Sequence, residues 1–119
     1  MCLELSHTRL DTFKVSKGVV INCYRETKNF PQEEKFGIFQ QIRRAALSVH
    51  LNIAEGSSRR SEAERKRYFE ISRGSIIEID AALDIAKELL YIETYNIDTL
   101  GKLMVECFKM LTGMIESRK

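Results

Sequence analysis

Tryptophan is absent from this 119-residue chain, proline occurs only once, and the three cysteines, Cys2, Cys23 and Cys107, form no CxxC pair. Small secreted domains that depend on disulfides carry cysteines densely and in even numbers, so this scattered set predicts a reducing, cytoplasmic environment. The two histidines are too few to complete a zinc shell around such cysteines. We therefore expect neither disulfides nor a bound metal or other cofactor.

Long apolar runs are also lacking, and no segment reaches the roughly 18 consecutive apolar residues of a membrane-spanning helix. The N-terminus has no basic segment followed by an apolar run, so it does not resemble an export signal. The phosphate-binding motifs GxxxxGKS/T and GxGxxG and the metalloprotease motif HExxH are missing as well. Two histidines leave little from which to build a nucleophilic triad. The sequence thus predicts a protein that is not an enzyme and has no membrane partner.

The residues that are present are typical of one globular domain, with 44% hydrophobic and 30% charged residues and a formal net charge of +2. We take residues 1–119 as that single domain. The charge is unevenly distributed. Between Arg43 and Arg73 there are eight basic and four acidic residues, a local charge of +4, so the rest of the chain sums to −2.

Apolar residues recur at intervals of three and four, whereas alternating strand-like runs are absent. This pattern predicts four helices, at residues 8–28, 31–55 and 61–90 and from Asn96 or Asp98 to residue 115. Pro31 suits the first turn of the second helix, Gly56 suits its C-terminal cap, and Ser61 to Glu64 has the form of a capping box. Short connections favour antiparallel neighbours, so we expect an all-α fold, an up-down-up-down four-helix bundle.

The second predicted helix carries two apolar stripes. One has the intervals of a packing seam and consists of Phe39, Ile42, Ala46, Val49 and Ile53. The other lies roughly 90–120° away around the helix, and consists of Phe36, Leu47, Leu51 and Ala54. A surface helix of a monomer needs only one such stripe. The second stripe therefore places this helix either deep in the bundle or, as we predict, at the interface of a homo-oligomer.

Several segments together carry a specific resemblance. They are Phe30-Pro31, QIRRAA at 41–46, NIAEG at 52–56, Arg59, Gly74-Ser75 and Glu78. At this spacing they resemble the four-helix-bundle family first named for proteins encoded in intervening sequences of 23S ribosomal RNA genes, over about residues 13–111. The resemblance implies a ring-like homopentamer. It also implies similarity to the accessory variability determinant of diversity-generating retroelements, a basic pentamer that binds nucleic acid and associates with a reverse transcriptase.

The connection between the second and third predicted helices has the features of an anion site. Gly56 permits a close backbone approach, and the first amide groups of the next helix lie at its positive end. The basic patch at this turn consists of Arg59, Arg60, Arg65, Lys66 and Arg67. Such side chains bind phosphates, so RNA or DNA is the expected partner. The alternative is a solvated helix start, in which neighbouring glutamates pair with these basic residues.

Four polar positions that the family motif singles out are interpreted as a structural network. They are Asn52, Glu55, Glu78 and one of Arg43 or Arg44. Glu78 lies at the edge of an apolar helix face, so a partly buried carboxylate there needs a cationic or hydrogen-bonding partner. We expect the arginine of the second helix to pair with a glutamate and to fix the helix register or a subunit contact. A catalytic acid–base pair is the alternative interpretation.

The function predicted from these features is that of a non-enzymatic, oligomeric accessory protein that binds the backbone of RNA or DNA through the basic patch. The alternative is a pentameric scaffold that binds another protein and has no role with nucleic acid. Salt dependence separates the two, because phosphate binding weakens steeply as salt rises whereas an apolar contact does not.

Overall fold

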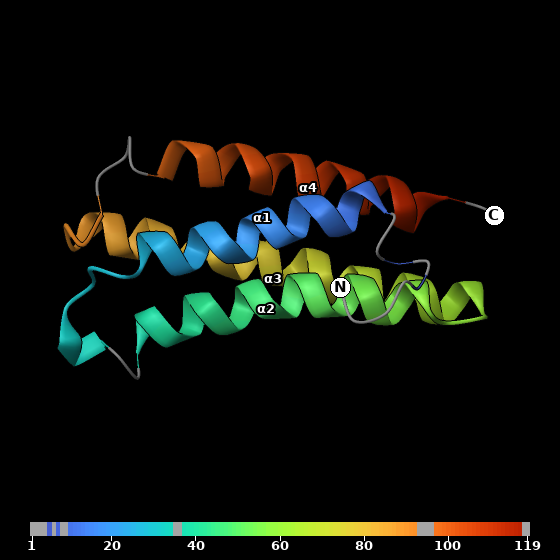
Figure 1. Cartoon of the computed structure of the whole chain (residues 1–119), viewed down its shortest axis with the longest axis horizontal. Helices are drawn as coiled ribbons and strands as arrows, with labels where there is room; N and C mark the ends of the chain where they lie inside the picture. The colour runs from blue at the N-terminus through green and yellow to red at the C-terminus, as the bar shows by residue number, and fades with distance from the viewer. Residues whose placement is uncertain (1–4, 6, 8–9, 35–36, 93–96, 118–119) are drawn as a thin grey trace.

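Four α-helices lie side by side in the computed structural model, which describes all residues except 1–4, 6, 8–9, 35–36, 93–96 and 118–119 (Figure 1). They are α1 (Asp11–Glu26), α2 (Ile38–Ser57), α3 (Glu62–Glu88) and α4 (Asp98–Glu116), and a short 3₁₀ turn, η2 (Gln32–Glu34), precedes α2. Each helix runs antiparallel to the next along the chain. The all-α, up-down-up-down four-helix bundle expected from the sequence is confirmed.

The predicted seam of the second helix forms the centre of the core. Ile42, Ala46, Val49 and Ile53 of α2 are completely buried, and Phe39 packs against them partly buried. The other helices add completely buried residues: Val19 and Cys23 of α1, Ile79 and Ala86 of α3, and Leu100, Cys107 and Leu111 of α4. All four helices therefore bury an apolar face against one shared core.

The start of the second helix differs from the prediction. The sequence predicts a helix from Pro31, but the described residues of this stretch form the η2 turn, and α2 begins at Ile38. Gly37 precedes α2 with φ −109° and ψ −123°, which lies outside the helical region. Glycine is a poor helix former, so the chain breaks at this residue instead of continuing the predicted helix through it.

Gly56 has a different role from the predicted C-terminal cap. The α2 helix continues to Ser57, and no glycine in the described ranges has a positive φ. A Cβ atom at Gly56 would lie 2.8 Å from Cε1 of Phe69 and 2.9 Å from Cβ of Tyr68. The absence of a side chain is therefore what allows α3 to pack directly against the backbone of α2.

The predicted cap of the third helix is confirmed. The Oγ atom of Ser61 accepts a hydrogen bond from the backbone N–H of Glu64 at 3.0 Å. At the other end of α3, Leu90 adopts a left-handed φ of 62°, a conformation that glycine usually supplies after a helix. Of the two caps expected for the last helix, Asn96 lies outside the described residues, and Asp98 is the first residue of α4.

The two sides of α3 pack differently. Toward α2, the hydroxyl of Ser72 donates a hydrogen bond to the carbonyl of Val49 at 2.7 Å, and both residues are completely buried. Toward α4, a groove of about 1100 Å³ separates the outer parts of the two helices. We call it the α3–α4 groove, and its edges include Ile77 and Val105. No helix in the described part of the chain combines the length and apolarity needed to cross a membrane.

Candidate functional site

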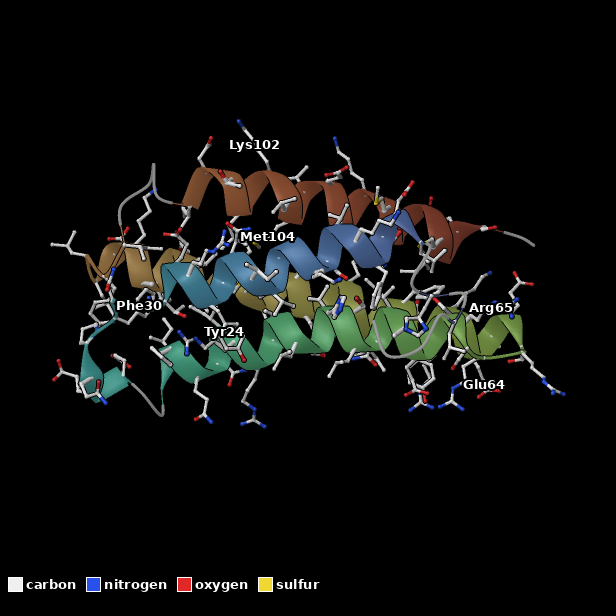
Figure 2. The ribbon with its side chains drawn as sticks, in the orientation of Figure 1. Tyr24, Phe30, Glu64, Arg65, Lys102 and Met104 are labelled. Carbon is white, nitrogen blue, oxygen red and sulfur yellow. The ribbon has the colours of Figure 1, made fainter. Side chains whose placement is uncertain are left out.

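The basic patch lies at one end of the bundle, where α2 ends and α3 begins. Figure 2 shows Glu64 and Arg65 at this end. A cavity of about 300 Å³ lies beside the patch, with Ser57, Glu62, Arg65 and Lys66 among its polar lining residues and apolar side chains making up much of the remainder. The predicted anion site therefore has a concave surface beside it, but the availability of its basic side chains depends on their internal contacts.

Arg59 is held by the fold. Its Nη2 atom donates to Oε2 of Glu55 at 2.7 Å and to the hydroxyl of Tyr68 at 3.1 Å, and its guanidinium group lies 5.0 Å from the centre of the Tyr68 ring. The Nε atom of Arg59 is buried without a hydrogen-bond partner among the described residues. A guanidinium group fixed in this way connects α2 to α3, so it does not offer the free bidentate face that the sequence predicts.

Arg65 and Lys66 are also occupied. The Nη1 atom of Arg65 donates to the carbonyl oxygens of Arg59 at 2.9 Å and Arg60 at 2.7 Å, which satisfies two acceptors of the turn. Lys66 forms an ion pair with Glu62, one helical turn earlier, at 3.2 Å. Both side chains are half-buried. The ion pair of Lys66 with Glu62 is the arrangement expected under the alternative interpretation, in which neighbouring glutamates pair with the basic residues at the start of the helix.

Arg60 and Arg67 are the two members of the basic patch whose side chains form no hydrogen bond or ion pair among the residues that the structure describes, and both are exposed. They lie on either side of the first turn of α3. One of the backbone N–H groups at the start of that helix already has an acceptor, because the Oγ atom of Ser61 accepts the N–H of Glu64. An anion at this turn would therefore meet two free guanidinium groups beside a helix N-terminus that carries its own cap.

A polar network does join α2 and α3, and Asn52 is the predicted member that belongs to it. The Nδ2 atom of Asn52 donates to the carbonyl of Ser48 at 2.8 Å and to its hydroxyl at 3.1 Å. The hydroxyls of Ser48 and Ser75 are hydrogen-bonded at 2.9 Å across the two helices. Asn52 therefore belongs to a serine-based network, and Glu55 belongs to the separate contact with Arg59.

The expected pair between Arg43 or Arg44 and a glutamate is not found among the described residues. Glu78 is exposed, and its Oε2 atom accepts a hydrogen bond from Gln41 at 3.1 Å. Arg43 points instead to α1, where Nε donates to the hydroxyl of Thr27 at 2.8 Å and Nη2 donates to the carbonyl of Tyr24 at 3.0 Å. Arg44 is exposed and has no contact with Glu78. Arg43 does not pair with Glu78 because Arg43 lies on the side of α2 that faces α1, whereas Glu78 belongs to α3.

The second apolar stripe of α2 is on the surface of the single chain. Leu51 is 58% exposed and Leu47 is 37% exposed, whereas Ala54 is partly buried against the core. Phe36 lies outside the described residues. A stripe that lay deep in the bundle would be covered by the other helices. The exposed leucines therefore argue against that position, and a subunit contact is the remaining interpretation of this stripe.

Two surfaces are missed by the sequence analysis. One is a set of exposed basic residues along α1 and just after it, Lys14, Lys17, Arg25 and Lys28. They alternate with the buried positions Thr12, Ser16, Val19, Cys23 and Thr27, so the helical period of this segment could have revealed them. The other is a set of exposed isoleucines on α3, Ile71, Ile77 and Ile85. Their exposure depends on how α3 packs against its neighbours, which the helical period alone does not determine.

Histidine and cysteine side chains are placed for packing. His50 stacks on Phe13 with 4.1 Å between ring centres, and its Nδ1 lies 2.6 Å from Oγ of the completely buried Ser16. The hydroxyl of Ser16 also lies 2.9 Å from the carbonyl oxygen of Phe13, and the tautomer of His50 determines which atom donates in the Ser16–His50 pair. Burial lowers the pKa of His50, and the charge of Lys17 lowers it further.

Burial has the opposite effect on the thiols. Desolvation raises the pKa of Cys23 and of Cys107 to about 12, so both thiols stay protonated and unreactive at neutral pH. Cys2 lies outside the described residues. Within the described ranges, no group of three or more His, Cys, Asp or Glu side chains is placed to hold a metal ion.

Comparisons with known proteins agree with this architecture. The family model described as 23S rRNA-intervening sequence protein matches residues 8–113. A crystal structure from Bacteroides thetaiotaomicron, described as a protein of unknown function from the S23 ribosomal protein family, superposes with a TM-score of 0.81. It is 21% identical, and the match covers 89% of this chain and 96% of that one. No curated protein matches the chain. The chain therefore belongs to the family of 23S rRNA-intervening sequence proteins.

Proposed function

We propose that this protein is a non-enzymatic, oligomeric accessory protein that binds the backbone of RNA or DNA at the turn between α2 and α3. The observation that carries the proposal is the exposure of Arg60 and Arg67, which have no internal partner among the described residues. A guanidinium group without an internal acceptor is available for a phosphate.

The basic patch divides into two sets of residues in this proposal. Arg59, Arg65 and Lys66 hold the turn in shape through their internal contacts. Arg60 and Arg67 contact the phosphates. Phosphate contacts position a strand without reading its bases, so binding with little sequence preference is expected.

The first half of α1 carries further basic residues. The contact between His50 and Ser16 places this part of α1 beside the second half of α2. Lys14 and Lys17 are exposed there, close to the end of the bundle that carries the basic patch. A nucleic acid strand that leaves the α2–α3 turn would therefore meet further positive charge along α1.

Self-association is the second part of the proposal. The ring-like homopentamer that the family resemblance implies would repeat the +4 segment between Arg43 and Arg73 five times, giving a charge of about +20. Contacts that are weak in one subunit then act together on the same strand. By the same resemblance, a reverse transcriptase is a further proposed partner.

A protein-binding scaffold is the competing function, and a specific observation favours it. Leu51, Ile77 and Val105 are all more than half exposed, and Ile77 and Val105 line the same α3–α4 groove. In this alternative the exposed apolar residues bind another protein and the basic patch has no ligand.

Fluorescence anisotropy separates the two functions. Labelled single-stranded RNA, duplex RNA and duplex DNA are titrated with the protein from about 50 to about 300 mM salt. We expect saturable binding that weakens steeply with salt. The double variant Arg60→Glu/Arg67→Glu should abolish binding at the upper half of this range and make the dependence on salt shallower, by about one unit of slope for each phosphate that the variant no longer binds.

The matched control is Arg25→Glu/Lys28→Glu, which makes the same change of charge at the other end of the bundle. It should retain most of the binding and the same oligomeric mass. Equal losses in both double variants would show that only the total charge matters. Absence of binding by the wild-type protein at about 50 mM salt would reject nucleic-acid binding and favour the scaffold.

A further inference from the structure

The cavity beside the basic patch lies at the end of the bundle where α2 and α4 end and α1 and α3 begin; Arg65, one of its lining residues, is labelled in Figure 2. We call it the end cavity. Its lining comes from the ends of α2 and α4, the first two turns of α3 and Leu10, which precedes α1. A volume of about 300 Å³ is at the lower end of the range for small-molecule sites. The end cavity therefore suits a molecule much smaller than a helix or a nucleic acid strand.

Apolar side chains form one part of the end cavity, and the fold holds them in place. Phe69 is only 6% exposed and lies against the backbone of α2 at Gly56. The Sδ atom of Met114 accepts a hydrogen bond from the hydroxyl of Thr12 at 3.2 Å, which joins α4 to α1. Leu10 packs against the core and is partly buried. This part of the cavity is therefore already shaped for an apolar group.

The polar part of the lining carries a positive charge that the described residues do not neutralise. Arg65 is bonded through Nη1 to the carbonyl oxygens of Arg59 and Arg60, which are uncharged acceptors. Lys66 and Glu62 also line the cavity, and they form an ion pair with each other. With two basic residues and one acidic residue, the charged lining has a net charge of +1. The start of α3 adds the positive end of its helix dipole.

The hydrogen-bonding groups that remain for a ligand are donors. Both bonds of Arg65 to the turn use Nη1, so Nη2 is left for a further acceptor. The hydroxyl of Ser57 already donates to the carbonyl of Ile53 at 2.7 Å. A carboxylate is an acceptor with one negative charge, so it matches both the donor and the net charge of this lining. A neutral ligand would leave the charge of Arg65 uncompensated.

We propose that the end cavity binds a small amphipathic monocarboxylate, with its apolar tail against Phe69 and Met114 and its carboxylate at Arg65. This site is separate from the proposed contact with nucleic acid. Arg67 follows Arg65 by two residues, or about 200° around α3, so it lies on another side of the helix. Arg65 keeps its bonds to the turn when the carboxylate is bound. The proposal therefore rests neither on nucleic-acid binding nor on self-association.

Octanoate, a straight-chain monocarboxylate, is the probe. Isothermal titration calorimetry with the full chain should show one saturable site per chain. Two comparison compounds separate the parts of the ligand: octanol keeps the tail without the charge, and acetate keeps the carboxylate without the tail. Each should bind at least about tenfold more weakly than octanoate, because it lacks either the charge-assisted hydrogen bond or the apolar burial.

Methyl NMR of methionine locates the bound octanoate. Met114 lines the end cavity, whereas Met104 lines the α3–α4 groove. With carbon-13 in the methionine methyl groups, octanoate should shift the Met114 signal with the same saturation as in calorimetry and leave the Met104 signal unchanged. A shift of Met104 without a shift of Met114 would place the ligand in the larger groove and overturn the assignment.

Two variants test the two parts of the cavity. Ser57→Leu fills the cavity without a change of charge; Ser57 is half-buried and its hydroxyl bond is local to α2, so the variant should keep its helical circular dichroism and lose octanoate binding. Arg65→Gln removes the positive charge and should weaken binding at least about tenfold. The matched control Arg44→Gln removes an exposed guanidinium group of α2 and should bind octanoate like the wild type.

Arg65 also supports the turn, so Arg65→Gln can lose stability for that reason. In that case the comparison of octanoate with octanol on the wild-type chain tests the charge. Octanol that binds as tightly as octanoate would overturn recognition of the carboxylate. Octanoate binding that survives Ser57→Leu, or no saturable binding up to about 10 mM, would overturn the site itself. Nucleic-acid binding is measured by anisotropy with Arg60→Glu/Arg67→Glu, so the failure of one proposal leaves the other unaffected.

Discussion

The α3 helix meets its two neighbours in contrasting ways. Toward α2 it presents buried serines, and Gly56 of α2 lets Phe69 lie against the α2 backbone. Toward α4 it presents the exposed Ile77, and Gly101 of α4 has open space where a side chain would be. Small residues thus bring two helices together on one side and leave room on the other. The same residue type can indicate close packing within a chain or space for a second molecule, and only the neighbours decide which.

The largest effect is expected at the close contact. Gly56→Ala should lower the free energy of unfolding by about 2 kcal/mol, because the new methyl group would overlap Phe69 and the Cβ atom of Tyr68, which cannot move without α3. Urea unfolding followed by circular dichroism measures the change. Helix propensity by itself favours alanine over glycine by about 1 kcal/mol. A variant as stable as the wild type would therefore show that α3 can shift away from α2.

A smaller loss is expected from the hydrogen bond on the same side. Ser72→Ala should lower the free energy of unfolding by about 1 kcal/mol, because the buried hydroxyl that donates to the carbonyl of Val49 is removed. The same unfolding measurement applies. Thr99→Ala, at an exposed hydroxyl, is the control and should change stability by less than about 0.5 kcal/mol. Equal effects of the two substitutions would deny this hydrogen bond a role in joining α2 to α3.

The groove side should respond with the opposite sign. Gly101→Ala should raise the free energy of unfolding by about 0.5–1 kcal/mol, because alanine favours the helix and the new methyl group meets no neighbour. Urea unfolding followed by circular dichroism measures the change. Lower stability of the variant would mean that α4 needs this glycine for a contact within the bundle.

The helical pattern of the sequence was sufficient to predict most of the fold. The seam from Ile42 to Ile53 is buried because its three-and-four spacing keeps one face of α2 toward the core. Ser61 begins α3 because its capping interaction is local. Gly56 was misinterpreted for a non-local reason: glycine is common after helices, but here the close approach of Phe69 determines its role.

The candidate site was less predictable, because the partner of a long charged side chain depends on tertiary structure. The pairing of Arg59 with Glu55 follows from their spacing on one helical turn. The contacts of Arg65 with two turn carbonyls do not, since the path of the turn creates them. Arg43 likewise selects Thr27 on α1, because its position around α2 faces away from Glu78. A count of basic residues therefore overestimates the charge that is available to a ligand.

The smallest effect is expected at Glu78, which lies on the close side of α3 but outside its buried contacts. Glu78→Gln should change the free energy of unfolding by less than about 0.5 kcal/mol, because the carboxylate is exposed and a glutamine carbonyl can still accept the hydrogen bond from Gln41. Removing one partner of a buried ion pair would cost roughly 3–5 kcal/mol. Unfolding measured over a range of protein concentrations makes the comparison sharper. A loss that appears only where the chain associates would place Glu78 against a second copy, whereas a loss at every concentration would mean that its contact with Gln41 is a substantial part of the α2–α3 packing.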